Sequence, residues 1–129
     1  KPTEPAPIIP TSQIPEKLDS LLASVEAMPQ SLNPNVSLEE RKRDVKASAQ
    51  EVKDAFTKGD IEDTRKRLAQ LRATIRGLGD QSKNRFIPKE IRDKYDPQGL
   101  VLKPTDIVDP AVMDQYLTVV QMELALFRK

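Results

Sequence analysis

Residues 37–78 read SLEERKRDVKASAQEVKDAFTKGDIEDTRKRLAQLRATIRGL, and this stretch decides the fold class. In its first half, apolar side chains recur at steps of three and four residues, the spacing of one helix face. They are Val45, Ala49, Val52 and Phe56. The second half carries a similar stripe, made of Ile61, Leu68, Leu71, Ile75 and Leu78. Because only a few residues separate the two stripes, helices over residues 37–58 and 60–78 are predicted to form an antiparallel hairpin.

Local signals mark the ends of both predicted helices. Ser37 and Glu40 match the capping box, in which each side chain satisfies a backbone N–H at the helix start. Gly59 supplies the left-handed residue that ends the first helix, and Asp60 is placed to cap the second. The second helix is expected to end at one of the two glycines that flank Leu78.

Two further amphipathic patterns lie outside the hairpin. Pro15 suits the first position of a helix and Pro29 disfavours helical geometry in the residue before it, so a helix is predicted over residues 15–28. An Asp-Pro pair starts a helix predicted over residues 110–128. This last segment is the most apolar of the four, and it is expected to be the most buried, with Phe127 on its apolar face.

Proline-rich segments separate or precede these helices. Four of the eleven prolines fall in the first ten residues, which favours an extended strap over residues 1–14. Prolines, a glycine and a polar run interrupt residues 80–109, so an irregular crossover is predicted there. Within it, residues 88–95 can form two helical turns, and residues 100–102 are expected to lie extended on the bundle surface.

These patterns predict an all-α protein, an up-down-up-down four-helix bundle with a Pro-rich N-terminal strap and a long irregular connection before the last helix. The strap covers residues 1–14 and the bundle residues 15–129, as one domain. The predicted core draws on all four helices and consists of Leu18, Leu22, Val25, Val45, Val52, Phe56, Leu68, Leu71, Ile75, Tyr116, Leu117, Val120 and Leu124.

The composition excludes most familiar catalytic chemistry. With no His and no Cys, the chain has no Ser-His-Asp triad, thiol nucleophile, disulfide or imidazole or thiolate zinc site. Carboxylates remain, but neighbours such as Glu39 and Glu40 point about 100° apart on a helix and cannot share a substrate. We therefore expect a protein that is not an enzyme and has no catalytic residues, cofactor or metal site. No apolar run approaches the roughly 20 residues needed to span a bilayer.

Charge is distributed unevenly along the chain. Residues 65–94 hold ten basic and three acidic side chains, a net charge of +7, whereas the whole chain has a net charge of only +1. The remainder is therefore net −6. Such segregation predicts a docking face that attracts a partner electrostatically. The predicted partner-binding residues are Arg65, Arg67, Arg72, Arg76, Lys83, Arg85, Lys89, Arg92 and Lys94.

Two interpretations of this basic segment stay open. Its side chains either dock a partner or belong to a solvated helix face and pair with acidic residues of the 37–58 helix. A docking partner is expected to be an acidic protein surface, since nucleic-acid domains usually carry a basic excess over the whole module. Nucleic acid is also disfavoured because most of the five aromatic residues stand at core-like positions: Phe56, Phe86, Tyr95, Tyr116 and Phe127.

The arrangement as a whole resembles the PsbQ-like extrinsic proteins of photosystem II, including the four-helix extrinsic subunit of diatoms. The features that carry the resemblance are the strap KPTEPAPIIP, the four amphipathic helices, the lack of Cys and a first residue, Lys1, that is interpreted as the start of a mature chain after removal of a leader. The connection over residues 80–109 is longer than in compact plant members.

The resemblance implies a function that residue chemistry alone does not give. A PsbQ-like protein is expected to be peripheral on the membrane in the thylakoid lumen of the chloroplast, and monomeric when free. It would dock through basic residues on photosystem II subunits and support oxygen evolution without catalysis of its own. The alternative is a helical adaptor or a nucleic-acid-binding bundle that uses the basic 65–94 segment.

Overall fold

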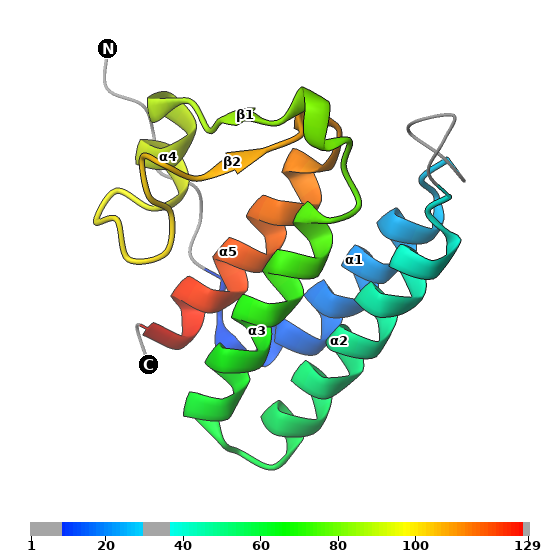
Figure 1. Ribbon diagram of the computed structural model, residues 1–129. Coiled ribbons are helices and arrows are strands. Elements are labelled where there is room, and N and C mark those ends of the chain that lie inside the picture. Colours follow the sequence, from blue (N-terminus) through cyan, green and yellow to red (C-terminus); the bar gives the residue numbers. More distant parts are fainter. Residues whose placement is uncertain (1–8, 30–36, 128–129) are drawn as a thin grey trace.

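The computed structural model describes residues 9–29 and 37–127, and these are predominantly helical (Figure 1). The long helices are α1 (Ile14–Glu26), α2 (Glu39–Thr57), α3 (Ile61–Arg76) and α5 (Met113–Phe127). Successive long helices run in alternate directions. Helix α2 packs along α3, α3 packs on α5, and α1 contacts both α2 and α5. The all-α prediction is therefore confirmed, with one small sheet added to it.

The segment predicted as an irregular crossover contains regular structure. Helix α4 (Lys89–Tyr95) occupies the predicted helical turns. Strand β1 (Arg85–Phe86) pairs antiparallel with β2 (Ile107–Val108), and the pairing was not predicted. We call residues 79–109 the cap, because they lie at the end of the helices where α3 finishes and α5 begins (Figure 1). Strands of two residues are too short to show a period-2 pattern, which is why the sequence did not reveal them.

The helix ends follow the predicted signals in part. Asp60 accepts a hydrogen bond from the N–H of Asp63 at 3.0 Å, and Gly59 has a φ of +77°, so both predictions for the α2–α3 turn are confirmed. Ser37 accepts from the N–H of Glu39 at 3.3 Å, so the reciprocal capping box predicted with Glu40 was wrong. Helix α3 ends before Gly77, whose φ of −67° is right-handed.

The N-terminal strap differs from its prediction where it is described. Residues 1–8 lie outside the described part of the chain, as does residue 128 of the last predicted helix. Thr11–Gln13 form a 3₁₀ turn that leads directly into α1, and the last helix likewise begins with a 3₁₀ turn over Pro110–Val112. Ile9 is buried in the core. The described end of the strap is therefore anchored to the helices, and residues 11–14 are not extended.

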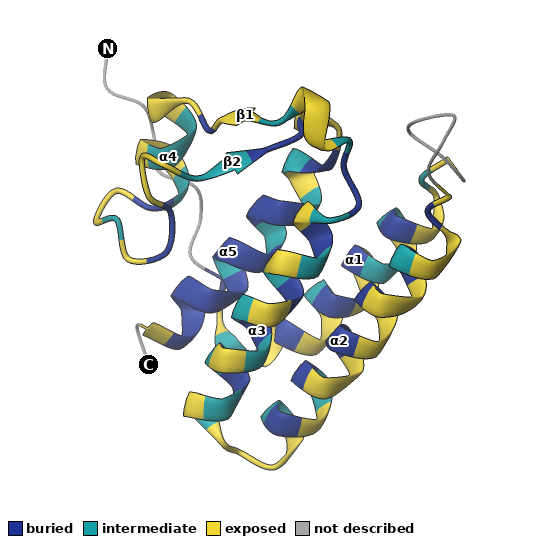
Figure 2. Cartoon of the chain, viewed as in Figure 1, coloured by how far each residue is buried: buried dark blue, intermediate teal, exposed yellow. Residues whose placement is uncertain are grey.

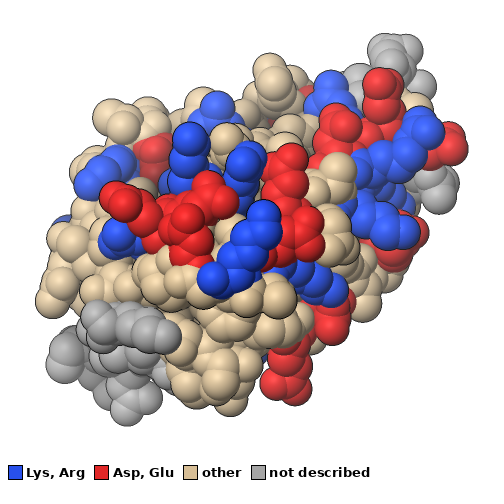
Figure 3. Space-filling model, turned by 90° about the horizontal axis from the view of Figure 1, so that it is seen from below, with Lys and Arg blue, Asp and Glu red and all other residues tan. Residues whose placement is uncertain are grey.

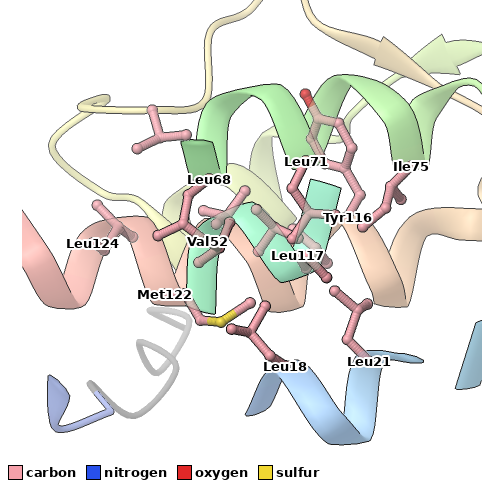
Figure 4. Close-up of a cluster of buried hydrophobic side chains, with 14 of the residues drawn as sticks. Leu18, Leu21, Val52, Leu68, Leu71, Ile75, Tyr116, Leu117, Met122 and Leu124 are labelled. Carbon is pink, nitrogen blue, oxygen red and sulfur yellow. The ribbon is translucent and has the colours of Figure 1, made fainter. Parts of the chain in front are cut away.

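The core lies between the long helices, where apolar side chains of α1, α2, α3 and α5 meet (Figure 4). All predicted core residues are buried except Leu22 and Phe56, which are half-buried at its edge. Helix α5 has nine buried residues and is the most buried helix of the described chain, as predicted (Figure 2). Phe127 was placed wrongly on its buried face, because it is 43% exposed at the helix end.

The cap adds apolar side chains to the same core. Residues 100–102 were predicted on the surface, but Val101 and Leu102 are buried and only Leu100 is exposed. The buried carboxylate of Asp96 explains this turn inward. It accepts hydrogen bonds from the N–H groups of Leu100, Val101 and Leu102 at 3.0, 2.7 and 2.7 Å. These bonds satisfy the backbone donors that burial removes from water.

Candidate docking surface

The nine predicted partner-binding residues do not share one face. Arg65, Arg72 and Arg76 are spaced by seven and four residues on α3, so they project from the same side of that helix. Arg67 is two residues from Arg65 and points to a different side. The other predicted residues, Lys83, Arg85, Lys89, Arg92 and Lys94, belong to the cap. The continuous basic segment is therefore distributed around α3 and over a second structural unit.

Arg72 is engaged inside the protein. Its Nε donates to Glu123 Oε1 of α5 at 2.7 Å, and its Nη1 donates to the Tyr116 hydroxyl at 3.2 Å. The Arg72 side chain is 21% exposed and that of Glu123 only 6%. The guanidinium also lies 5.7 Å from the centre of the Tyr116 ring. Arg72 thus links α3 to α5, and its guanidinium is already hydrogen-bonded within the chain.

Burial shifts the protonation equilibria of this ion pair. Burial raises the pKa of Glu123 above its ordinary value, and the hydrogen bond and charge of Arg72 oppose this shift without cancelling it. The negative charge of Asp96 adds to the increase. Burial alone would lower the pKa of Arg72, but the hydrogen bond and charge of Glu123 outweigh it and raise that pKa. Arg72 therefore stays charged while Glu123 can take a proton.

Two other arginines of α3 contact neighbouring helices. The Arg65 guanidinium lies 5.0 Å from the centre of the Phe127 ring at the end of α5. Arg67 pairs with Glu51 of α2 at 3.2 Å and with Asp63 of its own helix at 3.5 Å. The pair with Glu51 matches the interpretation in which basic side chains pair with the 37–58 helix. In the view of Figure 3, Lys and Arg are interspersed with Asp and Glu rather than gathered in one patch.

Three basic residues of the cap also make local contacts. Lys89 pairs with Asp93 at 2.7 Å along α4, and Arg92 Nε donates to the carbonyl oxygen of Ile87 at 3.3 Å. The ammonium of Lys94 lies 5.7 Å from the centre of the Tyr95 ring. Pairs this exposed contribute little to stability, so Lys89 can exchange Asp93 for a partner's carboxylate at small cost.

Arg76, Lys83, Arg85 and Lys94 are the members of the predicted set that are exposed and form no ion pair with any residue in the described ranges. Lys94 differs from the other three because its ammonium lies over the Tyr95 ring. Arg76 ends α3, Lys83 ends a 3₁₀ turn at Gln81–Lys83, and Arg85 begins β1. Their charges face water, where an acidic surface can reach them. They form the candidate docking surface.

Sequence reasoning missed two residues, one exposed beside Arg85 and one buried against Arg72. Most of the five aromatic residues were predicted at core-like positions and Phe86 was not singled out from them, but it is 67% exposed and immediately follows Arg85. A two-residue strand gives no period-2 signal for this, and only the structure shows that Ile87, the next residue, is the one that is buried. Glu123 was also missed, although an acidic residue within the apolar run of the last helix indicates a buried charge that needs a partner.

No group of three or more acidic side chains is placed to hold a metal ion in residues 9–29 and 37–127. One hollow of about 250 Å³ is lined by residues that include Ser20, Ser24 and Gln115. Within the same residues, each helix is too short or too polar to traverse a bilayer. No known protein family, curated protein or solved structure matches this chain.

Proposed function

We propose that this chain is a non-catalytic extrinsic subunit of photosystem II, with a PsbQ-like four-helix bundle as its scaffold. It docks on the lumenal side of the complex through basic side chains and supports oxygen evolution there, as a peripheral protein of the thylakoid lumen. The resemblance of the sequence to PsbQ-like proteins is the reason for proposing photosystem II as the complex. The chemistry of the described surface supplies the mode of docking.

The observation that carries the docking mode is the exposure of Arg76, Lys83 and Arg85 without ion pairs among the described residues. Such charges act mainly on the rate of association and on its dependence on salt. Arg65, Arg67 and Arg72 support the proposal less, because each already contacts another part of the chain. Because regular structure already fixes the backbone at these three positions, binding has to order only their side chains.

The proposal is tested by rebinding the purified chain to salt-washed photosystem II membranes. The wild-type chain should rebind at low salt, be released by high salt and restore part of the lost oxygen evolution. A variant with Arg76→Glu, Lys83→Glu and Arg85→Glu should associate about tenfold more slowly. Failure of the wild-type chain to rebind would remove the photosystem proposal.

A charge-matched control separates a docking surface from general attraction. Lys46, Lys58 and Lys66 are exposed and form no ion pair with described residues, and reversing all three changes the net charge equally. This control should associate almost as fast as the wild-type chain. Equal slowing of both triple variants would mean that only net charge matters. Circular dichroism checks that both variants fold.

A nucleic-acid-binding bundle is the second candidate, favoured by one observation. Phe86 is exposed next to Arg85, and an exposed ring beside cations is a feature of single-strand binding. A filter-binding titration with single-stranded RNA and duplex DNA distinguishes the candidates. Tight binding at physiological salt that weakens steeply as salt rises would replace the photosystem proposal.

A further inference from the structure

The segment over residues 81–89 combines charge and an exposed ring. It reads QSKNRFIPK and contains three cations, Lys83, Arg85 and Lys89, and no carboxylate. Phe86 has the largest exposed fraction among the exposed large hydrophobic residues of the described chain, at 67%. The other exposed phenylalanine, Phe127, has the guanidinium of Arg65 over its ring. Phe86 has no such cation over it among the described residues.

The backbone around Phe86 is held from both sides. Phe86 pairs with Ile107 in the antiparallel register of β1 and β2, and the N–H of Ile87 donates to the carbonyl oxygen of Asp106 at 3.3 Å. The carbonyl oxygen of Ile87 accepts from Arg92 of α4. Ile87 is buried, so it fixes the strand to the core while its neighbour points away. The ring is therefore presented to solvent by an anchored strand, and binding it costs little ordering entropy.

We infer that Lys83, Arg85 and Phe86, which we call the cap edge, dock an acidic protein surface that contains an apolar recess for the Phe86 ring. The inference rests on the proposed function, and it names the residues through which the chain would contact photosystem II. The ring would fill the recess, and carboxylates around it would pair with Arg85 and Lys83. A buried aromatic anchor surrounded by charged pairs is the usual form of an interface hot spot.

The observations favour a protein over the two other anionic partners. Stable membrane anchoring takes stronger apolar or lipid signals than one ring. Single-strand binding uses several aromatic rings along a groove, and Phe86 is the one exposed aromatic of the cap, since Tyr95 is half-buried beneath Lys94. A net charge of only +1 also favours a defined acidic surface over a polyanion.

The test compares variants of the full chain on salt-washed photosystem II membranes. Phe86→Ser should weaken binding at least tenfold, mainly through faster dissociation, and should leave the salt dependence unchanged. Phe127→Ser is the matched control, because it removes the other exposed phenylalanine, and it should bind like the wild-type chain. Lys83→Gln with Arg85→Gln should slow association and flatten the salt dependence, whereas Lys58→Gln with Lys66→Gln should not.

The outcomes separate the inference from the proposed function. If the wild-type chain binds and Phe86→Ser binds equally well, the cap edge is not the contact and the inference fails while the proposed function stands. If the wild-type chain does not bind, both fail. Vesicles made from lipids of the same membranes, and a single-stranded oligonucleotide, serve as other partners. If the wild-type chain bound either of these and Phe86→Ser abolished that binding, the inference of a protein partner would be overturned.

Discussion

Two predicted docking cations of the α2–α3 hairpin, Arg67 and Arg72, differ in their contacts from two of the cap, Lys83 and Arg85. In the hairpin, Arg67 pairs with an acidic residue of α2, and Arg72 is held by Glu123 and Tyr116 of α5. In the cap, Lys83 and Arg85 face water without an ion pair in the described chain. The difference shows that net charge along a sequence does not define a charged face. A helix turns successive residues by about 100° toward different neighbours, whereas Lys83 and Arg85 lie in a short 3₁₀ turn and a two-residue strand that leave both of them exposed.

The largest effect is expected from the core of the hairpin. Leu71→Ala should lower the free energy of unfolding by about 3 kcal/mol, because Leu71 is fully buried and its truncation leaves a cavity. Urea unfolding followed by circular dichroism measures the change. Lys66→Ala on the exposed side of the same helix should change it by less than about 0.5 kcal/mol. Equal values for the two variants would contradict the phase assigned to α3.

A slightly smaller effect is expected from the internal ion pair. Arg72→Ala should lower the free energy of unfolding at neutral pH by about 2 to 3 kcal/mol, because it leaves the carboxylate of Glu123 buried without its partner. Arg76 is exposed one turn further along α3, so Arg76→Ala should hardly change the free energy of unfolding. If both variants were neutral, Arg72 would behave like a surface cation, and the contrast between hairpin and cap would disappear.

The joint between hairpin and cap is sensitive to one methyl group. A Cβ on Gly79 would lie 2.6 Å from the Cβ of Asp109, whose carboxylate accepts from the N–H groups of Asp80 and Ala111. Gly79→Ala should therefore cost about 1 to 2 kcal/mol. Hydrogen exchange should show faster opening at the Asp80 and Ala111 amides. In a double-mutant cycle with Asp109→Gly, which removes the clashing Cβ, additive costs would contradict this contact.

The smallest effect is a change of stability with pH. Burial raises the pKa of Glu123 above its ordinary value of 4.5, so ionisation is less favourable in the folded protein than in the unfolded chain. The stability due to this group is fully present below the unfolded pKa and is lost as pH rises through the folded pKa. The free energy of unfolding of the wild type, relative to Glu123→Gln, should fall as pH rises above 4.5.

Thermal melts of both proteins across this pH range, at constant ionic strength, measure the difference. Arg72 remains charged throughout, so Arg72→Ala should be less harmful at acidic pH, where Glu123 takes a proton. If the free energy of unfolding of the wild type, relative to Glu123→Gln, rose with pH instead, the attraction between Arg72 and the Glu123 carboxylate would outweigh the cost of burying that carboxylate. The other titrating groups cancel in the comparison, because the two proteins differ at one position.

Local signals predicted the helices well, because a helix depends on residues three and four positions apart. Asp60 and Gly59 placed the α2–α3 turn, and the apolar stripes identified most of the core. The docking residues stay a prediction. Their partners depend on which helices meet, so the sequence could not show that Arg72 is held by Glu123, 51 positions away.

The sequence by itself determined the helical class, the position of the α2–α3 turn and the uneven distribution of charge, since each follows from composition or short-range spacing. The tertiary structure decided which cations face inward and which face water. It also paired β1 with β2, turned Val101 and Leu102 into the core through Asp96, and left Phe86 outside. These outcomes depend on contacts between residues far apart in the chain, which form only when packing brings the segments together.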